Sequence, residues 1–345
     1  MNVTPLAVGV DIAKQVFQVH EVDPMSGEIR RTPLKRAKFL AYFANHATCV
    51  VGMEACGGAH HWARRLVAMG HAVKLLPAHK VRPFAVGNKN DVADAQAIWT
   101  AMQQPGMRTV AIKTESQQAV LALHRMRTQL VIFRTAQINA LRGLFNEFGE
   151  VMPTGRPSAM KAIPAVLERL AERLPTVLID TLREQVQRVR DLDAQVLTIE
   201  RRLKRWFDIE RACQRIAAIP GIGLLTATAA VATMGDPLAF RSGREFAAWL
   251  GLVPRQVGTG GKVKLRGISK RGDTYLRTLL IHGARAVLAR NQAPSAWLTR
   301  LRARRPMNVV AVALANKMAR TLWALMAHQR TYRKDYASPP PAVAA

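Results

Sequence analysis

The sequence predicts an α/β domain at its N-terminal end, followed by an α-helical coiled-coil region and a mainly α-helical C-terminal domain. Short apolar runs rich in Val and other small residues alternate with turns over the first 80 residues, as buried strands do. Long helical periodicities begin near residue 115, and shorter helical runs separated by glycine-containing turns follow residue 210. The expected boundaries are 1–112, 113–210 and 211–335, with a disordered, proline-containing tail at 336–345.

The α/β domain is expected to open with three strands in a meander and to continue with alternating helices and strands. The strands are expected at 6–10, 16–22, 28–33, 48–53 and 73–76, and the first two helices at 35–45 and 60–69. This order is that of a ribonuclease-H-like sheet. It differs from a dinucleotide-binding fold, and no GxGxxG motif follows the first strand.

Four carboxylates stand where this sheet would bring them together. Asp11 ends the first strand and Glu54 ends the fourth, and these strands are neighbours in a sheet of this order. Asp91 and Asp94 are three residues apart, at the start of a helix that Asn90 can cap and that runs to about Met102. Taken alone, Asp11 fits an ordinary turn residue, and the aspartate pair fits a cap followed by a first-turn acid.

Together these four residues favour a catalytic metal site. Clustered carboxylates repel one another unless cations neutralise them, and hard oxygen ligands suit Mg²⁺ or Mn²⁺. Two such ions about 4 Å apart activate a nucleophile and stabilise the leaving oxygen of a phosphodiester. The sequence therefore predicts Asp11, Glu54, Asp91 and Asp94 as catalytic residues and as ligands of two Mg²⁺ ions.

The middle region predicts three helices, at about 117–148, 159–174 and 176–207. The first carries a candidate apolar stripe at Val120, Leu123, Leu130, Ile138, Leu141, Leu144 and Phe148. The third alternates spacings of four and three at Leu178, Leu182, Gln185, Val189, Leu192, Val196, Ile199, Leu203 and Trp206. This heptad pattern fits an oligomeric coiled coil or an antiparallel hairpin within one chain, and Gln185 could fix its register.

Two glycine-containing segments of the C-terminal region are candidates for phosphate contact. Pro220-Gly221-Ile222-Gly223, ahead of a helix, is typical of a helix-hairpin-helix turn whose N–H groups face a phosphate, although a plain turn is the alternative. Residues 254–273 contain five glycines and a run of cations. The residues expected to bind nucleic acid are Gly221, Gly223, Arg255, Lys262, Lys264, Arg266, Lys270, Arg271 and Arg277. A hydroxyl there, on Thr259 or Ser269, could be a nucleophile or a simple hydrogen-bonding group.

The composition indicates a polyanionic partner. The net charge is +28, and residues 211–335 hold 22 Lys and Arg against 4 Asp and Glu. The three cysteines are not spaced as a disulfide framework or a four-cysteine zinc site, which suggests a reducing cytoplasm. We expect no leader, since a basic-then-apolar pattern is absent near residue 1, and we expect no apolar run to reach the length of a membrane span.

The order of these motifs resembles the DEDD transposases of bacterial insertion sequences, the bridge-RNA-guided or seeker-RNA-guided recombinases. The resemblance covers about residues 6–330. Its motifs are Gly9 to Lys14, Met53-Glu54-Ala55, Lys89 to Ala95, Ile219 to Gly223, and Gly251 to Arg255 continuing to Ser269-Lys270.

The resemblance implies a RuvC-like domain whose Asp11, Glu54, Asp91 and Asp94 hold Mg²⁺, a coiled coil for oligomerisation, and a C-terminal transposase domain. It also implies assembly of dimers or tetramers on donor and target DNA with a structured guide RNA. In the family a serine of the glycine-rich loop attacks the DNA backbone, in a site shared with the carboxylates of another subunit. That position is Thr259 here, with Ser269 and Ser242 as alternatives.

The leading hypothesis is a metal-dependent, RNA-guided DNA recombinase. A hydrolytic RuvC-like junction nuclease would use water in place of the hydroxyl. A non-catalytic nucleic-acid-binding protein would keep the charge and have no use for the carboxylates.

Overall fold

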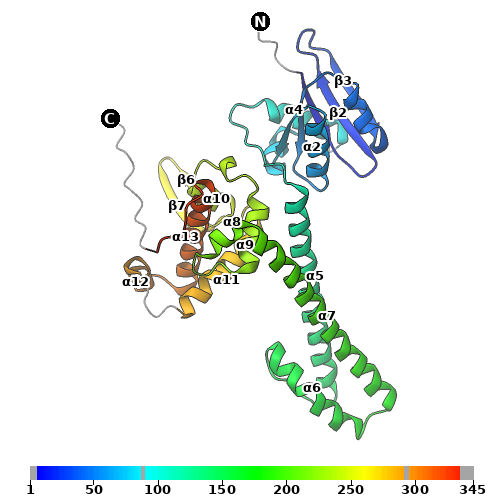
Figure 1. Ribbon diagram of the computed structural model, residues 1–345, viewed down its shortest axis with the longest axis vertical. Coiled ribbons are helices and arrows are strands. Elements are labelled where there is room, and N and C mark those ends of the chain that lie inside the picture. Colours follow the sequence, from blue (N-terminus) through cyan, green and yellow to red (C-terminus); the bar gives the residue numbers. More distant parts are fainter. Residues whose placement is uncertain (1–5, 87–89, 291–294, 335–345) are drawn as a thin grey trace. The chain divides into compact units, whose positions relative to one another are not determined.

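The computed structural model describes residues 6–86, 90–290 and 295–334 (Figure 1). The chain forms two compact units: residues 1–118 with 234–241, and residues 119–233 with 242–345. The predicted tail at 336–345 and Lys89 of the matching motifs lie outside the described residues. The predicted division at residue 210 falls inside the second unit and stays a prediction.

The first unit is built on a mixed five-stranded sheet of order β3-β2-β1-β4-β5. The strands are β1 Ala7–Asp11, β2 Val16–Val22, β3 Ile29–Lys35, β4 Val50–Glu54 and β5 Ala72–Leu76. β2 is antiparallel to β1 and β3, whereas β4 is parallel to both β1 and β5. The prediction that the Asp11 and Glu54 strands are neighbours is confirmed, and the order is that of a ribonuclease-H-like sheet.

Short helices connect and cover these strands. They are η1 Arg36–Lys38, α1 Phe39–Ala44, α2 Ala59–Ala68, α3 Ala78–Val81, η2 Arg82–Phe84, α4 Asp91–Gln103 and η3 Pro237–Ala239. On one face of the sheet, Val8, Val10 and Met53 belong to a core that includes Phe39 of α1 and Leu66 of α2. Alternate residues of the same strands point to the other face, which α4 covers.

Two glycines allow α4 to lie close against the sheet. Gly9 of β1 and Gly52 of β4 are paired across the two strands. A Cβ on Gly9 would lie 2.5 Å from the Ala95 carbonyl oxygen, and one on Gly52 would lie 2.6 Å from the Met102 sulfur. The Trp99 indole N–H of α4 also donates a hydrogen bond to the Ala7 carbonyl of β1, at 3.0 Å. These contacts hold α4 against β1 and β4, and its first turn lies beside Asp11 at the end of β1.

In the second unit, α5 (Glu115–Glu147) and α7 (Thr176–Ile209) run antiparallel, with α6 (Arg156–Ala171) packed beside them (Figure 1). Polar pairs join α5 to α7: Arg134 bonds Asp193 at 2.7 Å, and the Gln137 side chain donates to Gln185 at 2.9 Å. The heptad pattern fitted either an oligomeric coiled coil or an antiparallel hairpin, and the structure shows α5 and α7 paired antiparallel within one chain. The predicted stripe was wrong at Leu144, which is 44% exposed, because the neighbouring Phe145 is the residue that packs inside.

The rest of the second unit is mainly helical. Its helices are α8 Arg211–Ala217, α9 Leu224–Met234, α10 Gly243–Trp249, α11 Thr274–Arg290, α12 Ala296–Arg302 and α13 Met307–Ala327. By length and composition alone α13 could cross a membrane, contrary to the expectation that no run would reach that length. One side of α13 is buried against α10 and α11, through Val310, Ala311, Ala315, Met318, Ala319, Leu322 and Leu325, as in a helix that packs on a core.

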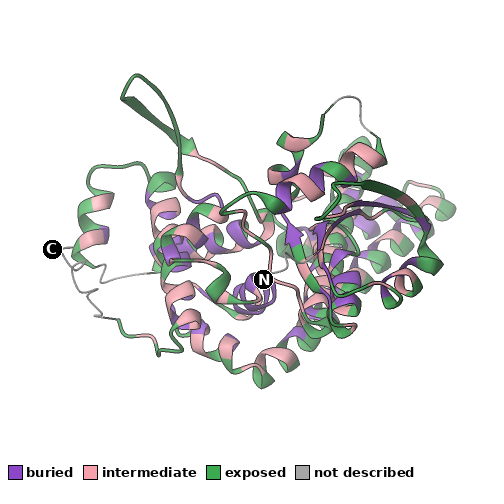
Figure 2. Cartoon of the chain, turned by 90° about the horizontal axis from the view of Figure 1, so that it is seen from above, coloured by how far each residue is buried: buried purple, intermediate pink, exposed green. Residues whose placement is uncertain are grey.

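The segment expected to be a glycine-rich loop is a β-hairpin, made of β6 (Pro254–Thr259) and β7 (Lys262–Ile268). Gly260 and Gly261 both have positive φ, as a two-residue hairpin turn requires. Nearly all of the hairpin is exposed, as the green colour in Figure 2 shows. Val263 and Leu265 alternate with Lys262, Lys264 and Arg266, and Gly260-Gly261 precedes them, so the sequence does contain a hairpin signal. The glycines and cations of this segment were instead interpreted as a phosphate-binding loop.

Candidate functional site

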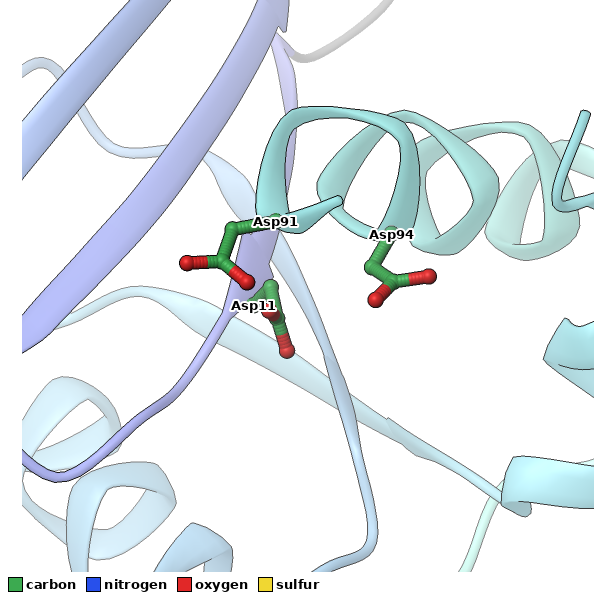
Figure 3. A group of neighbouring side chains, drawn as sticks. All are labelled: Asp11, Asp91 and Asp94. Carbon is green, nitrogen blue, oxygen red and sulfur yellow. The ribbon is translucent and has the colours of Figure 1, made fainter. Parts of the chain in front are cut away.

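Three of the four predicted carboxylates meet at the end of the sheet. Asp11 is the last residue of β1, and Asp91 and Asp94 are the first and fourth residues of α4. One ligand oxygen from each carboxylate lies within 4.8 Å of the others. Figure 3 shows the two α4 side chains beside that of Asp11. Asp11 and Asp94 are half-buried and Asp91 is exposed, so the group is open to solvent on one side.

Local sequence explains why the α4 carboxylates point this way. The Asn90 side chain accepts a hydrogen bond from the Ala93 N–H at 2.8 Å, which caps the helix and fixes its first turn. Residues 91 and 94 then lie on the same face of that turn. The partial positive charge at a helix N-terminus also stabilises carboxylates placed there.

Glu54 lies at the same edge of the sheet but outside the group of three. It ends β4, which is hydrogen-bonded to β1. The Cys56 thiol lies near the carboxylates that end both strands. Burial is the largest cause that raises the pKa of this thiol, and the negative charges of Glu54 and Asp11 raise that pKa further. Both carboxylates are therefore within electrostatic reach of one thiol. A donor set made only of carboxylate oxygens fits Mg²⁺ or Mn²⁺.

Thr259 and two lysines share one face of the β6–β7 hairpin. Thr259 lies directly opposite Lys262, and Val257 lies opposite Lys264. Because opposite residues and alternate residues of paired strands share a face, Thr259, Lys262 and Lys264 project from the same face of the hairpin. Two cations next to an exposed hydroxyl form a surface suited to a phosphodiester.

The other candidate hydroxyls are less accessible. The Ser269 Oγ is buried, although the residue as a whole is half-buried. Ser242 is the N-cap of α10, where its Oγ accepts a hydrogen bond from the Glu245 N–H at 3.3 Å. Thr259 is fully on the surface and therefore the best placed of the three.

The remaining residues predicted to bind nucleic acid differ in their exposure to solvent. Arg255, Lys262, Lys264, Arg266, Lys270 and Arg271 are all exposed. Arg277 is buried, and its guanidinium donates to the Leu250 and Arg271 carbonyls at 2.9 and 2.8 Å. Those bonds hold the base of the hairpin to α10, so the expectation that Arg277 contacts nucleic acid does not fit its position.

The predicted turn at 220–223 joins α8 to α9, and its two glycines differ. Gly221 has positive φ, and a Cβ there would lie 2.7 Å from the Gly283 carbonyl of α11. Close helix packing therefore accounts for this glycine. Gly223 is exposed with open space beside it, so its N–H remains the better placed of the two for a phosphate.

Comparison with known proteins agrees with this geometry. A family model described as "Transposase" of the DEDD IS110 type matches residues 8–149, and one described as "Transposase IS116/IS110/IS902 family" matches residues 213–298. A "Probable family 20 transposase" of Pseudomonas aeruginosa is 48% identical over 331 residues, which cover 94% of this chain and 98% of that protein. The chain belongs to the IS110/IS116 family of transposases.

Two further relatives are transposases of named insertion sequences. The transposase of IS1111A from Coxiella burnetii is 43% identical, across 94% of this chain and 91% of that protein. The transposase of IS1328 from Yersinia enterocolitica is 40% identical, across 96% and 99%. The chain is therefore an enzyme that cuts and rejoins DNA, and the resemblance found from its motifs is confirmed at the level of the family.

Sequence reasoning missed the glycines that position α4. Gly9 and Gly52 lie inside apolar strands, where glycine often marks the close approach of another backbone. That signal was present in both strand motifs.

Proposed function

We propose that this transposase is a Mg²⁺-dependent, RNA-guided DNA recombinase in which Asp11, Glu54, Asp91 and Asp94 hold the metal and Thr259 supplies the attacking hydroxyl. The observation that carries the metal proposal is the convergence of Asp11, Asp91 and Asp94 within 4.8 Å. The guide RNA, and a shared site between subunits of a homo-oligomer, rest on the family resemblance. The three free cysteines fit a cytoplasmic location.

Each group has a stated role in this proposal. Bound Mg²⁺ would supply positive charge to a phosphodiester and its leaving oxygen. The carboxylates position that charge at the end of the sheet, and the hairpin lysines hold a phosphate beside Thr259. The Thr259 oxygen loses its proton and forms a bond to phosphorus, while the bond from phosphorus to the departing strand breaks and the departing oxygen takes a proton. Attack by a hydroxyl of the new strand then releases Thr259 and completes rejoining.

Strand cleavage by site variants tests the metal and hydroxyl assignments together. We expect Asp11→Asn to lose Mg²⁺-dependent cleavage by at least about 100-fold, because one ligand charge is gone. Glu28→Gln is the matched control, since Glu28 is exposed and its ion-pair partner is the exposed Arg30. Full cleavage by Asp11→Asn would contradict the metal site.

Thr259→Ala separates a recombinase from a hydrolytic nuclease. We expect it to abolish the covalent protein–DNA product, and we expect Thr259→Ser to restore that product. Continued cleavage by Thr259→Ala would favour water as the nucleophile. Copurification followed by RNA sequencing tests the guide, and a preparation without a discrete RNA would argue against it.

A further inference from the structure

A large pocket in the second unit has no part in the chemistry proposed above. It is formed by α10, β7, α12, α13 and residues 328–333, and it encloses about 1420 Å³. Small-molecule sites usually occupy about 300–1,000 Å³. The α13 residues that line it extend from Asn308 to Leu325. At about 1.5 Å per residue this α13 pocket is about 25 Å long, which suits a chain-like ligand.

The charge around the α13 pocket has one sign. Six exposed cations line it: Arg244, Arg266, Lys317, Arg320, Arg330 and Arg333. Among the described residues that line the pocket, none is an Asp or Glu. Such a lining attracts a polyanion and disfavours an acid-poor peptide.

The walls between these cations are aromatic and apolar. Trp297, Trp323 and Tyr332 line the pocket and are half-buried, so each has both a packed side and an accessible side. The Lys317 ammonium lies 4.9 Å from the centre of the Trp297 ring, which places a cation next to an aromatic surface. Val309 and Val312 add apolar surface from α13.

The backbone behind this lining is closely packed. A Cβ on Gly243 would lie 2.8 Å from the Arg320 carbonyl oxygen, so α10 and α13 are in backbone contact. The Asn316 side chain also donates to the Leu252 carbonyl at 3.1 Å. Close backbone packing therefore fixes the α10 and α13 walls of the pocket.

We infer that the α13 pocket binds a short stretch of single-stranded nucleic acid, with bases against its aromatic and apolar walls and phosphates on its cations. Single-strand sites combine a basic groove with aromatic rings on which bases stack. A duplex keeps its bases inside and offers mainly phosphates to a surface, so it would leave the apolar walls unused. Unpaired DNA and RNA share the required chemistry. This inference goes beyond the carboxylate and hydroxyl chemistry and does not depend on it.

Binding of short oligonucleotides to the full chain tests the inference. The measurement is fluorescence anisotropy with labelled (dT)15, (rU)15 and a 15-base-pair duplex, in EDTA so that no strand is cut. We expect Lys317→Glu with Arg320→Glu to weaken binding of the single strands at least about tenfold, and to weaken duplex binding no more than the control does. Arg300→Glu with Arg302→Glu is the matched control, since both residues are exposed on α12 outside the pocket lining and change the net charge equally.

Quenching of tryptophan fluorescence provides a second measurement, which detects base stacking and does not follow from charge alone. We expect single strands to quench tryptophan fluorescence, and we expect Trp323→Phe to reduce this quenching while thermal melting shows a folded protein. Tighter binding of (rU)15 or of (dT)15 identifies which single strand is the ligand. Equal weakening of single-strand and duplex binding, or no difference from the control, would overturn the inference. Because no cleavage is measured, these outcomes are independent of the fate of Asp11 and Thr259 variants.

Discussion

At the scale of single residues, Gly9 controls the distance between α4 and the sheet, and with it the positions of Asp91 and Asp94. A methyl group at Gly9 would overlap the Ala95 carbonyl and Trp99 of α4. We expect Gly9→Ala to push α4 outward, to cost about 1–3 kcal/mol of unfolding free energy, and to lower strand cleavage by about 100-fold. Cleavage rates and urea unfolding of the same preparation measure the two effects.

Gly57→Ala is the control for this substitution. Gly57 lies close to Glu54 in sequence, but a Cβ there would meet nothing within 4 Å. We expect it to leave both quantities nearly unchanged. If Gly9→Ala cleaved at the rate of the natural chain, close packing of α4 would not be what positions its carboxylates.

The carboxylates could be predicted from the sequence, whereas their supports could not. Asp11 and Glu54 end apolar runs, and Asp91 follows a capping asparagine, so local pattern alone indicated them. The functions of Gly9 and Gly52 depend on which helix covers their face of the sheet, and one-dimensional periodicity does not contain that information. The burial of Arg277 could not be predicted from the sequence either. Its carbonyl partners come from the end of α10 and the base of the hairpin, which only the fold brings together.

At the scale of elements, His124 links three helices of the second unit. The Thr228 hydroxyl of α9 donates its proton to the Leu224 carbonyl at 2.8 Å, so His124 Nε2–H donates to Thr228, at 3.0 Å. Nδ1 then accepts from the Tyr275 hydroxyl of α11, at 2.9 Å. The network therefore requires neutral histidine. Burial, followed by the charge of Arg127, lowers the pKa of His124 to about 4.

This lowered pKa predicts acid sensitivity. Between pH 6.5 and about 4 the unfolded chain binds a proton at His124 that the folded chain does not, so unfolding free energy falls as pH falls through this window. We expect a loss approaching about 3 kcal/mol by the lower end of the window. Urea unfolding from pH 7.5 to 4.5 measures it, and His124→Gln should flatten the curve. The exposed His282→Gln is the control, and identical curves for the natural chain and His124→Gln would contradict the assignment.

The elements that sequence patterns predicted are those that pack apolar residues into a core. β1, β2, α2, α4 and α7 all bury apolar residues, and each was expected near its observed bounds. The β6–β7 hairpin was not predicted, because the glycines and cations of residues 254–273 were interpreted as a loop, although the alternation of β7 and the Gly260-Gly261 turn are a hairpin signal. The short helices α8 and α12 were also missed, since fewer than two full turns give too few periodic positions.

At the scale of the whole molecule, the two units differ in the charged residues that they carry. The first unit brings three carboxylates together at the end of its sheet, and the second unit holds 36 of the 51 Lys and Arg residues, including those of the hairpin and of the α13 pocket. A transposase must hold more than one DNA segment at once, and the group of Asp11, Asp91 and Asp94 can act on one phosphodiester at a time. This requirement favours assembly of several copies.

The α5 helix carries two exposed apolar side chains that would be covered if copies of the chain packed through this face. Met126 and Phe133 are seven residues apart on one face and are 50% and 52% exposed, and Met126 also lines a hollow of about 480 Å³ beside α7. We expect Met126→Glu with Phe133→Glu to convert dimers or tetramers to monomers in analytical ultracentrifugation, because charge at this spacing disfavours helix packing between copies. Melting temperature should change little, since neither residue is buried. Val151→Glu with Val177→Glu adds the same charge at other exposed apolar positions of the same unit and should leave the assembly intact. An unchanged sedimentation coefficient for the α5 variant would place the interface on another face.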